Sequence, residues 1–307
     1  MKSAAKKGSA VKKSIAARGH NVSSAMLADR AMFVRLETLR LARICGAGHY
    51  SSTFSAAELF AALYYAHLNI DPKDPDWPDR DRFILSKGHA AIGLYPILAD
   101  LGYYPMSELD TFTRLGSHFG DHPNMKHIPG IDFSSGSLGH GLSVGVGMAL
   151  AGRMQQRDYR VYCMLGDGEL AEGQIWEAAM AASHYKLQGL IAIIDRNQLC
   201  IDGHTEEVMR VEPLEQRFRS FGWEVQRIDG HDFEAILPAL GQLKPAGTGK
   251  PQALICDTIK GRGVKRMELS LQWHVANLAG EDYDDAEAEI RAGLRPLAKR
   301  GKKRGKN

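Results

Sequence analysis

The residues best suited to chemistry are Asp167 and Asn197, which stand thirty positions apart and each follow an apolar run. If the two runs are parallel strands joined by a helix, that spacing brings both side chains to one edge of a sheet. Carboxylate and amide oxygens are hard donors that suit Mg²⁺, with Ca²⁺ or Mn²⁺ as alternatives. Glycines on both sides of Asp167 let a phosphate approach the backbone. The expected ligand is therefore a diphosphate held through a metal.

Four of the twelve histidines lie beside glycines or in turns: His49, His89, His122 and His274. Imidazole changes charge near neutral pH, so it is the side chain best suited to binding hydroxyls and moving their protons. Each of the four alone is more typical of a surface or capping residue, so the prediction rests on their joint occurrence in sequence blocks that match a known family. We assign no catalytic role to His118, His127, His140, His184, His204 or His231.

The elements that must position these residues alternate between strands and helices in the second half of the chain. This order predicts a doubly wound α/β fold, with a mostly parallel sheet and helices on both faces. In such sheets ligands bind outside the carboxyl ends of the strands. A capping box of Ser55 and Glu58 predicts the start of an early helix. The expected strands are 82–85, 159–165, 190–195, 224–228 and 253–258, and the other helices are 31–45, 142–154, 175–185, 214–221, 233–243 and 283–294.

From about Arg35 to Asn277 the sequence resembles the diphosphate-binding domain of transketolase. Gly166-Asp167-Gly168 followed by Asn197 is similar to the thiamine-diphosphate signature. The remaining blocks that carry the resemblance are Gly48-His49, 81–89, 120–123, 136–141, 258–261 and Trp273-His274. The resemblance implies the thiamine-diphosphate-binding fold and thiamine diphosphate as the cofactor.

The resemblance also assigns roles to single residues. Asp167, Asn197 and the carbonyl of Leu199 are implied to bind the metal, and Asn197 also counts among the cofactor-binding residues. Gly168, His89 and His274 are implied to contact the diphosphate. Gly136, Ser137 and Leu138 are implied to line the aminopyrimidine. The implied catalytic residues, which face the sugar, are His49, His122 and His274.

Only about thirty residues follow Trp273-His274, so the second domain that completes a transketolase does not fit in this sequence. The resemblance therefore implies the N-terminal subunit of a split transketolase that needs a C-terminal subunit, in an α2β2 assembly. Such an enzyme transfers a two-carbon ketol unit from a ketose to an aldose. Departures from the family at Tyr50-Ser51-Ser52, Ser137 and Val275-Ala276-Asn277 point to an unusual donor, such as a branched or sulfonated ketose.

The charge of the chain is unevenly distributed. Its 39 basic and 36 acidic residues give a net charge of +3, yet residues 1–20 and 299–307 each hold six basic residues and no acidic one. Without these the body carries about −9. We therefore expect a disordered basic tail over 1–27, one cofactor-binding domain over 28–298 and a basic tail over 299–307. An acidic body argues against nucleic acid as a partner.

Composition excludes further classes of protein. No apolar run is long enough to span a membrane, and the N-terminus lacks the apolar core of a secretory signal. The four cysteines are widely spaced, which argues against a zinc site and fits a reducing cytoplasm.

Three alternatives stay open on the sequence alone. The first is another two-subunit thiamine-diphosphate enzyme, either a 2-oxo acid dehydrogenase E1 α-like subunit or a deoxyxylulose-phosphate synthase-like one. The second is a nicotinamide dinucleotide loop at Gly139–Gly145, which would have to follow a strand although 132–137 is turn-like. The third is a non-enzymatic module whose basic tails bind a polyanion.

Overall fold

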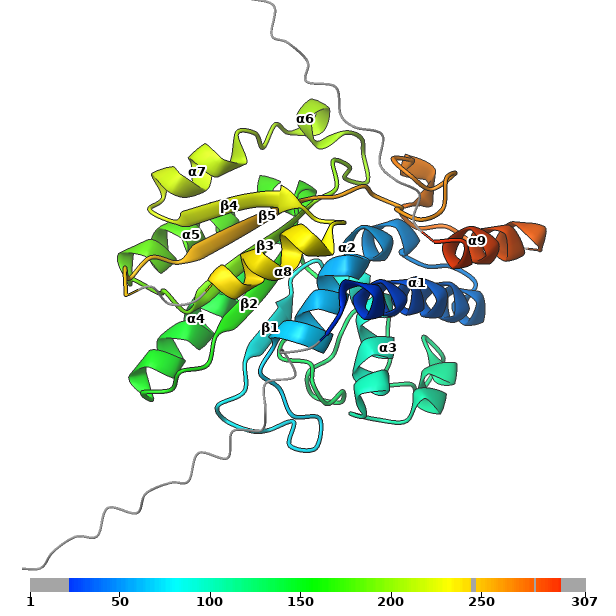
Figure 1. Cartoon of the computed structure of the whole chain (residues 1–307), viewed down its shortest axis with the longest axis horizontal. Coiled ribbons are helices and arrows are strands. Elements are labelled where there is room, and N and C mark those ends of the chain that lie inside the picture. The colour runs from blue at the N-terminus through cyan, green and yellow to red at the C-terminus, as the bar shows by residue number, and fades with distance from the viewer. Residues whose placement is uncertain (1–21, 244–246, 279, 294–307) are drawn as a thin grey trace, which may run out of the picture.

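The computed structural model describes residues 22–243, 247–278 and 280–293. Its described strands form one sheet of five, in the order β1-β2-β3-β5-β4, and every neighbouring pair is parallel. The predicted parallel α/β sheet is therefore confirmed (Figure 1). The strands are β1 (Arg82–Leu85), β2 (Val161–Gly166), β3 (Leu190–Arg196), β4 (Glu224–Asp229) and β5 (Gln252–Asp257).

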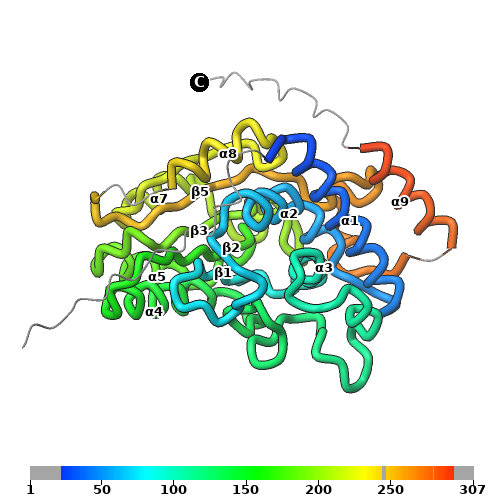
Figure 2. Tube along the Cα trace, turned by 60° about the horizontal axis from the view of Figure 1, so that its bottom comes forward, coloured from blue at the N-terminus to red at the C-terminus, as the bar shows by residue number. Residues whose placement is uncertain are grey.

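Helices cover both faces of this sheet. In Figure 2, α1, α2 and α8 lie on one side of the strands, and α4 and α5 lie on the other. Alternate side chains of β2 serve the two layers, since Tyr162 and Met164 join the first core and Cys163 and Leu165 the second. The α-helices are α1 (Ser24–Cys45), α2 (Tyr50–Ala62), α3 (Ala91–Leu101), α4 (His140–Met154), α5 (Gly173–His184), α6 (Thr205–Val208), α7 (Leu214–Ser220), α8 (Phe233–Gln242) and α9 (Glu281–Arg291).

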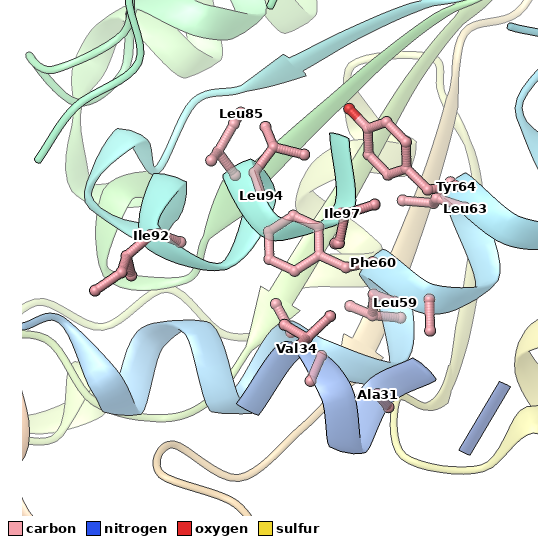
Figure 3. Packing of buried hydrophobic residues seen from close by; sticks show 14 of the residues in the cluster. Ala31, Val34, Leu59, Phe60, Leu63, Tyr64, Leu85, Ile92, Leu94 and Ile97 are labelled. Atoms are coloured by element: carbon pink, nitrogen blue, oxygen red, sulfur yellow. The ribbon is translucent and has the colours of Figure 1, made fainter. Parts of the chain in front are cut away.

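The helix α2 is held firmly because it is buried along its whole length. Figure 3 shows Phe60 of α2 directed toward Leu94 and Ile97 of α3. The two helices approach so closely that a Cβ atom at Gly93 would lie 2.2 Å from Thr53 Cγ2. Only glycine permits this approach, and the close packing fixes the polar residues that α2 presents to the sheet.

Two boundary predictions are wrong. The first helix begins at Ser24 rather than near 31, so the last residues assigned to the N-terminal tail are helical, and Leu27 is fully buried. The second helix begins at Tyr50, which places Ser55 inside it rather than at its N-cap. The Ser55 hydroxyl donates to the buried carboxylate of Asp195 at 2.7 Å instead of capping the helix. Residues 1–21 and 299–307, which hold the rest of the predicted tails, lie outside the described residues.

The described ranges contain no helix that is both long and apolar enough to cross a membrane.

Candidate active site

One cavity of about 420 Å³ collects most of the residues singled out in the sequence. It opens where β2 and β3 end, at the edge of the sheet where ligands of such folds bind. The predicted residues that line it are His49, His89, His122, Gly136, Leu138, Asp167, Gly168, Asn197, Leu199 and His274. Ser137 is exposed and is not among the lining residues.

Three oxygen donors predicted for a metal belong to this cavity: those of Asp167, Asn197 and the Leu199 carbonyl. Asp167 Oδ2 accepts a hydrogen bond from the backbone N–H of Gln198 at 2.7 Å, which ties the end of β2 to the segment after β3. Asn197 Oδ1 accepts one from Leu199 N at 3.2 Å. The thirty-residue spacing therefore brings together the loops that it was predicted to bring together.

Two side-chain cations already contact these oxygens. Arg196 forms an ion pair with Asp167 at 2.5 Å, and Lys260 Nζ donates to the Leu199 carbonyl at 3.0 Å. Burial still raises the pKa of the Asp167 carboxyl above its ordinary value, because it outweighs the attraction of Arg196, and Asp195 adds to the rise. The hard oxygen donors of this site fit a divalent cation.

The glycine after Asp167 is required by the packing of the loop that carries Leu199. A Cβ atom at position 168 would lie 2.8 Å from Cys200 Cβ, closer than two such atoms approach in proteins. Because Cys200 directly follows Leu199, a side chain at 168 would press on the segment that carries the Leu199 carbonyl. Gly168 therefore has a steric role as well as the cofactor contact that the sequence predicts.

We expect Gly168→Ala to weaken thiamine diphosphate binding about tenfold or more by moving this loop, with the fold retained. The measurement is calorimetric titration of thiamine diphosphate, with Mg²⁺ present, into the chain combined with the C-terminal subunit that the family resemblance implies. Gly147→Ala is the matched control, because Gly147 lies in α4 and a Cβ atom there would have no neighbour within 4 Å. Equal cofactor affinity in both variants would show that position 168 tolerates a side chain.

The four predicted histidines form one cluster around His49. Its ring centroid lies 5.2 Å from that of His89, 5.6 Å from that of His274 and 6.4 Å from that of His122. Asp121, which the sequence analysis did not single out, lies against two of them: its Oδ1 is 3.2 Å from His49 Nδ1 and its Oδ2 is 3.7 Å from His122 Nδ1.

Backbone contacts hold the histidine segments together. Gly48 and Ala276 form a two-way antiparallel bridge, which joins the chain before His49 to the chain after His274. The Ser51 hydroxyl donates to the carbonyl of Trp273 at 2.8 Å. Ser51 departs from the family pattern, yet its observed role is to position the His274 segment.

Two histidines of the cluster are kept neutral by their surroundings. Burial lowers the pKa of His89 well below its ordinary value, and the charge of Lys87 adds to the effect. Burial and then Lys260 lower the pKa of His274 to about 3. Lys260 Nζ lies 2.7 Å from His274 Nδ1, and an ammonium group can only donate. The hydrogen of the His274 ring is therefore on Nε2, which makes that atom a hydrogen-bond donor.

Comparison with known protein families gives a match over most of the chain. A profile described as "Transketolase, thiamine diphosphate binding domain" matches residues 29–299. The chain belongs to the transketolase family. The identification agrees with the geometry, because the oxygen donors and the histidine cluster share one cavity.

Relatives of this transketolase domain include proteins of similar length. The 6-deoxy-6-sulfo-D-fructose transketolase subunit SqwG of Clostridium sp. (strain MSTE9) is 45% identical over 264 residues, which are 86% of this chain and 96% of that protein. An apulose-4-phosphate transketolase subunit of Phocaeicola vulgatus is 42% identical, over 82% of this chain and 89% of that protein.

Solved transketolases share the fold but are longer. The transketolase of Campylobacter jejuni superposes with a TM-score of 0.82 at 32% identity, over 88% of this chain. The matched region is 43% of that protein, so this transketolase domain spans less than half of it. The family match and the superposition support a transketolase over the other two-subunit thiamine-diphosphate enzymes and over the dinucleotide-binding loop. The structure also shows no strand between 86 and 160, a range it describes in full, so Gly139 does not follow one.

A buried polar network beside the cavity escaped sequence reasoning. Lys87, 1% exposed, pairs with the fully buried Asp195 at 2.5 Å, and Asp195 Oδ2 also accepts from Ser55 Oγ at 2.7 Å and from Asn197 Nδ2 at 3.1 Å. Burial raises the pKa of Asp195, but the charge and hydrogen bond of Lys87 outweigh it, so the pKa is lower than usual. The hydrogen bond to Asp195 fixes the Asn197 amide through its Nδ2 atom, so this network does not use Asn197 Oδ1.

Glu169 is a second buried residue that the sequence did not mark. Its Oε1 atom accepts hydrogen bonds from Ser86 Oγ and, at 2.9 Å, from Gly139 N, and its Oε2 accepts from Gly166 N at 3.0 Å. One carboxylate therefore joins the segment after β1, the start of α4 and the end of β2. A glutamate after Gly-Asp-Gly gives no periodic signal, so only the structure reveals this role.

Proposed function

We propose that the chain is the N-terminal subunit of a two-subunit transketolase, which binds thiamine diphosphate and a divalent metal and transfers a two-carbon ketol unit between sugars. The observation that carries the proposal is the single cavity in which four histidines adjoin the oxygens of Asp167, Asn197 and Leu199. Clustered histidines suit a polyhydroxylated donor better than a 2-oxo acid, because an imidazole ring can hydrogen-bond a hydroxyl, either as donor or as acceptor of its proton.

Asp167, Asn197 and the Leu199 carbonyl would hold the metal, which is Mg²⁺ with Ca²⁺ or Mn²⁺ as alternatives. Gly168, His89 and His274 would contact the diphosphate, and Gly136, Ser137 and Leu138 would line the aminopyrimidine. When bound, the cofactor supplies an electron sink for the two-carbon unit.

The remaining chemistry falls to residues of the chain. His49, His122 and His274 would orient the hydroxyls of the donor and move their protons. The Nε2 hydrogen of neutral His274 can be donated to a substrate oxygen, since Lys260 occupies its Nδ1. The burial of His89 helps to exclude water from this side of the cavity.

The second half of the enzyme would come from a partner, a C-terminal transketolase subunit, in an α2β2 assembly. Two relatives of similar length are themselves named as subunits, which supports this division. One of these relatives is named for a sulfonated ketose and the other for apulose 4-phosphate, which supports our proposal of an unusual donor, such as a sulfonated or branched ketose. A cytoplasmic location stays a prediction from the spacing of the cysteines.

Removal of the metal tests the proposed site. We expect EDTA to abolish thiamine diphosphate binding by the chain combined with its partner subunit and added Mg²⁺ to restore it, because Asp167, Asn197 and the Leu199 carbonyl would hold the cation through which the diphosphate binds. Calorimetric titration with and without EDTA measures the effect, and assays with sulfonated, branched and phosphorylated ketoses identify the donor. Cofactor binding of unchanged affinity in EDTA would contradict the metal site.

A further inference from the structure

Asp121 is the one carboxylate found against two histidines of the cavity, within the described residues. Its Oδ1 atom lies 3.2 Å from His49 Nδ1, within hydrogen-bond distance, while His122 Nδ1 lies 3.7 Å from Oδ2, an ion-pair contact. Both histidines line the cavity, and Asp121 itself is not among the lining residues. It therefore acts through the histidines rather than by contact with a ligand.

The chain before Asp121 is anchored in the core. Phe119 is 4% exposed and packs against the rings of Tyr95 and Tyr104, at centroid distances of 5.5 and 5.0 Å. The Tyr95 hydroxyl donates to the carbonyl of Gly120 at 2.9 Å. The carboxylate thus follows two fixed residues, so its place beside His49 is set by the fold rather than by a mobile loop.

The carboxylate is ionised at neutral pH. Partial burial raises its pKa, but the hydrogen bond from His49 and the proximity of His49 and His122 outweigh this and lower it below the ordinary value. An ionised carboxylate can only accept, so the hydrogen of the His49 ring must be on Nδ1. In the neutral ring, Nε2 then carries the lone pair.

We propose that Asp121 is a positioning residue that fixes His49 as the proton acceptor of the cavity. His49 and His274 then present opposite functions, since Asp121 leaves an acceptor at His49 Nε2 and Lys260 leaves a donor at His274 Nε2. Their rings lie 5.6 Å apart. A ketol donor has hydroxyls that must lose a proton and a carbonyl that must be polarised, and this pair offers one ring for each. The role of His49 as proton acceptor rests on the proposed function, whereas the contact between Asp121 and His49 does not.

The first experiment reads the tautomer of His49 directly. In the full chain labelled with ¹⁵N, two-bond ¹H–¹⁵N correlation spectra distinguish Nδ1–H from Nε2–H rings, and a His49→Gln variant assigns the signal. We expect the Nδ1–H form in the natural chain and a shift toward Nε2–H in Asp121→Ala. His89, His122 and His274 also face His49, so the spectra are recorded above the pH at which any ring of the cluster gains a proton. An Nε2–H ring in the natural chain would overturn the inference.

The second experiment measures ketol transfer by the chain combined with its partner subunit. Asp121→Ala should lower kcat about tenfold to a hundredfold, the loss typical when the outer partner of a functional histidine is removed. KM for the donor and the affinity for thiamine diphosphate should stay within about twofold, whereas a merely structural role would change them too. The control is Asp110→Asn. This substitution removes the ion pair between Asp110 and Arg40, outside the cavity, and should leave kcat unchanged.

The outcomes separate this inference from the proposed function. An Nδ1–H ring without ketol transfer from any ketose would leave the tautomer assignment standing and remove the proposed function. Ketol transfer that is insensitive to Asp121→Ala would retain the function and overturn the role of Asp121.

Discussion

Asp167→Asn is expected to lower ketol transfer by the reconstituted enzyme about a hundredfold or more, since even the outer-shell partners of metal ligands contribute ten- to a hundredfold. The carboxylate supplies the one negative charge among the three oxygens proposed for the metal, and an amide supplies none. Thiamine diphosphate affinity should fall together with activity. Arg196 keeps Glu206 and Glu212 as partners at 3.2 and 3.1 Å, so its charge is not left unpaired and the fold should survive.

The measurements are initial rates, cofactor titration and thermal unfolding of the same protein. Asp76→Asn is the matched control, because Asp76 is exposed and does not line the cavity. A variant that keeps full activity at Asp167 would remove this residue from the metal site.

Glu58→Gln is expected to lower the free energy of unfolding by about 3–5 kcal/mol, the usual cost when one member of a buried ion pair is removed. Glu58 and Arg35 are 1% and 2% exposed and form a double hydrogen bond at 2.6 and 2.8 Å. His231 Nδ1 lies 2.8 Å from the same carboxylate, and its Nε2 accepts from Ile259 N. The variant would leave the Arg35 guanidinium buried without its charge partner.

Acid sensitivity gives a second measure of the same pair. Burial raises the pKa of Glu58, but Arg35 and His231 outweigh it and lower the pKa to about 2, from 4.5. Because the folded pKa is the lower one, the carboxylate stabilises the fold above about pH 4.5, and this contribution is lost as the pH falls toward 2. Urea unfolding at several pH values should show a weaker loss over this range in Glu58→Gln.

The control for Glu58→Gln is the same substitution in a glutamate–arginine ion pair at the surface. Glu287 and Arg291 form an exposed i,i+4 ion pair, so Glu287→Gln should change the free energy of unfolding by less than about 1 kcal/mol. A similar small change for Glu58→Gln would show that burial does not make the Arg35 pair important.

The sequence predicted those parts of the fold and site that depend on short-range pattern. Apolar runs separated by helical periods indicate the parallel sheet, and the spacing from Asp167 to Asn197 indicates that two loops meet at one edge. Both signals are local, because the spacing of apolar residues within a short segment is enough to distinguish a strand from a helix. The expected helices and strands of the second half accordingly begin or end within a few residues of the observed ones.

The residues that the sequence did not reveal are those whose partners lie far away in the chain. Lys87 and Asp195 are 108 positions apart, and Arg35 contacts the carbonyl of Arg262 across 227 positions. Ser55, three positions before Glu58, has the pattern of a capping box. In the structure, however, the Ser55 hydroxyl contacts Asp195 and the Glu58 carboxylate contacts Arg35 inside the core. Tertiary contacts override such local patterns, and periodicity does not encode them.

Ketol transfer by the purified chain, alone and mixed with a purified C-terminal transketolase subunit, is the decisive measurement. Both samples contain thiamine diphosphate, Mg²⁺, a ketose donor and an aldose acceptor. We predict no transfer by the chain alone and clear transfer by the mixture, since we propose that the cavity of this chain is one part of a site shared with that subunit. Transfer by the chain alone at the rate of the mixture would contradict the proposal.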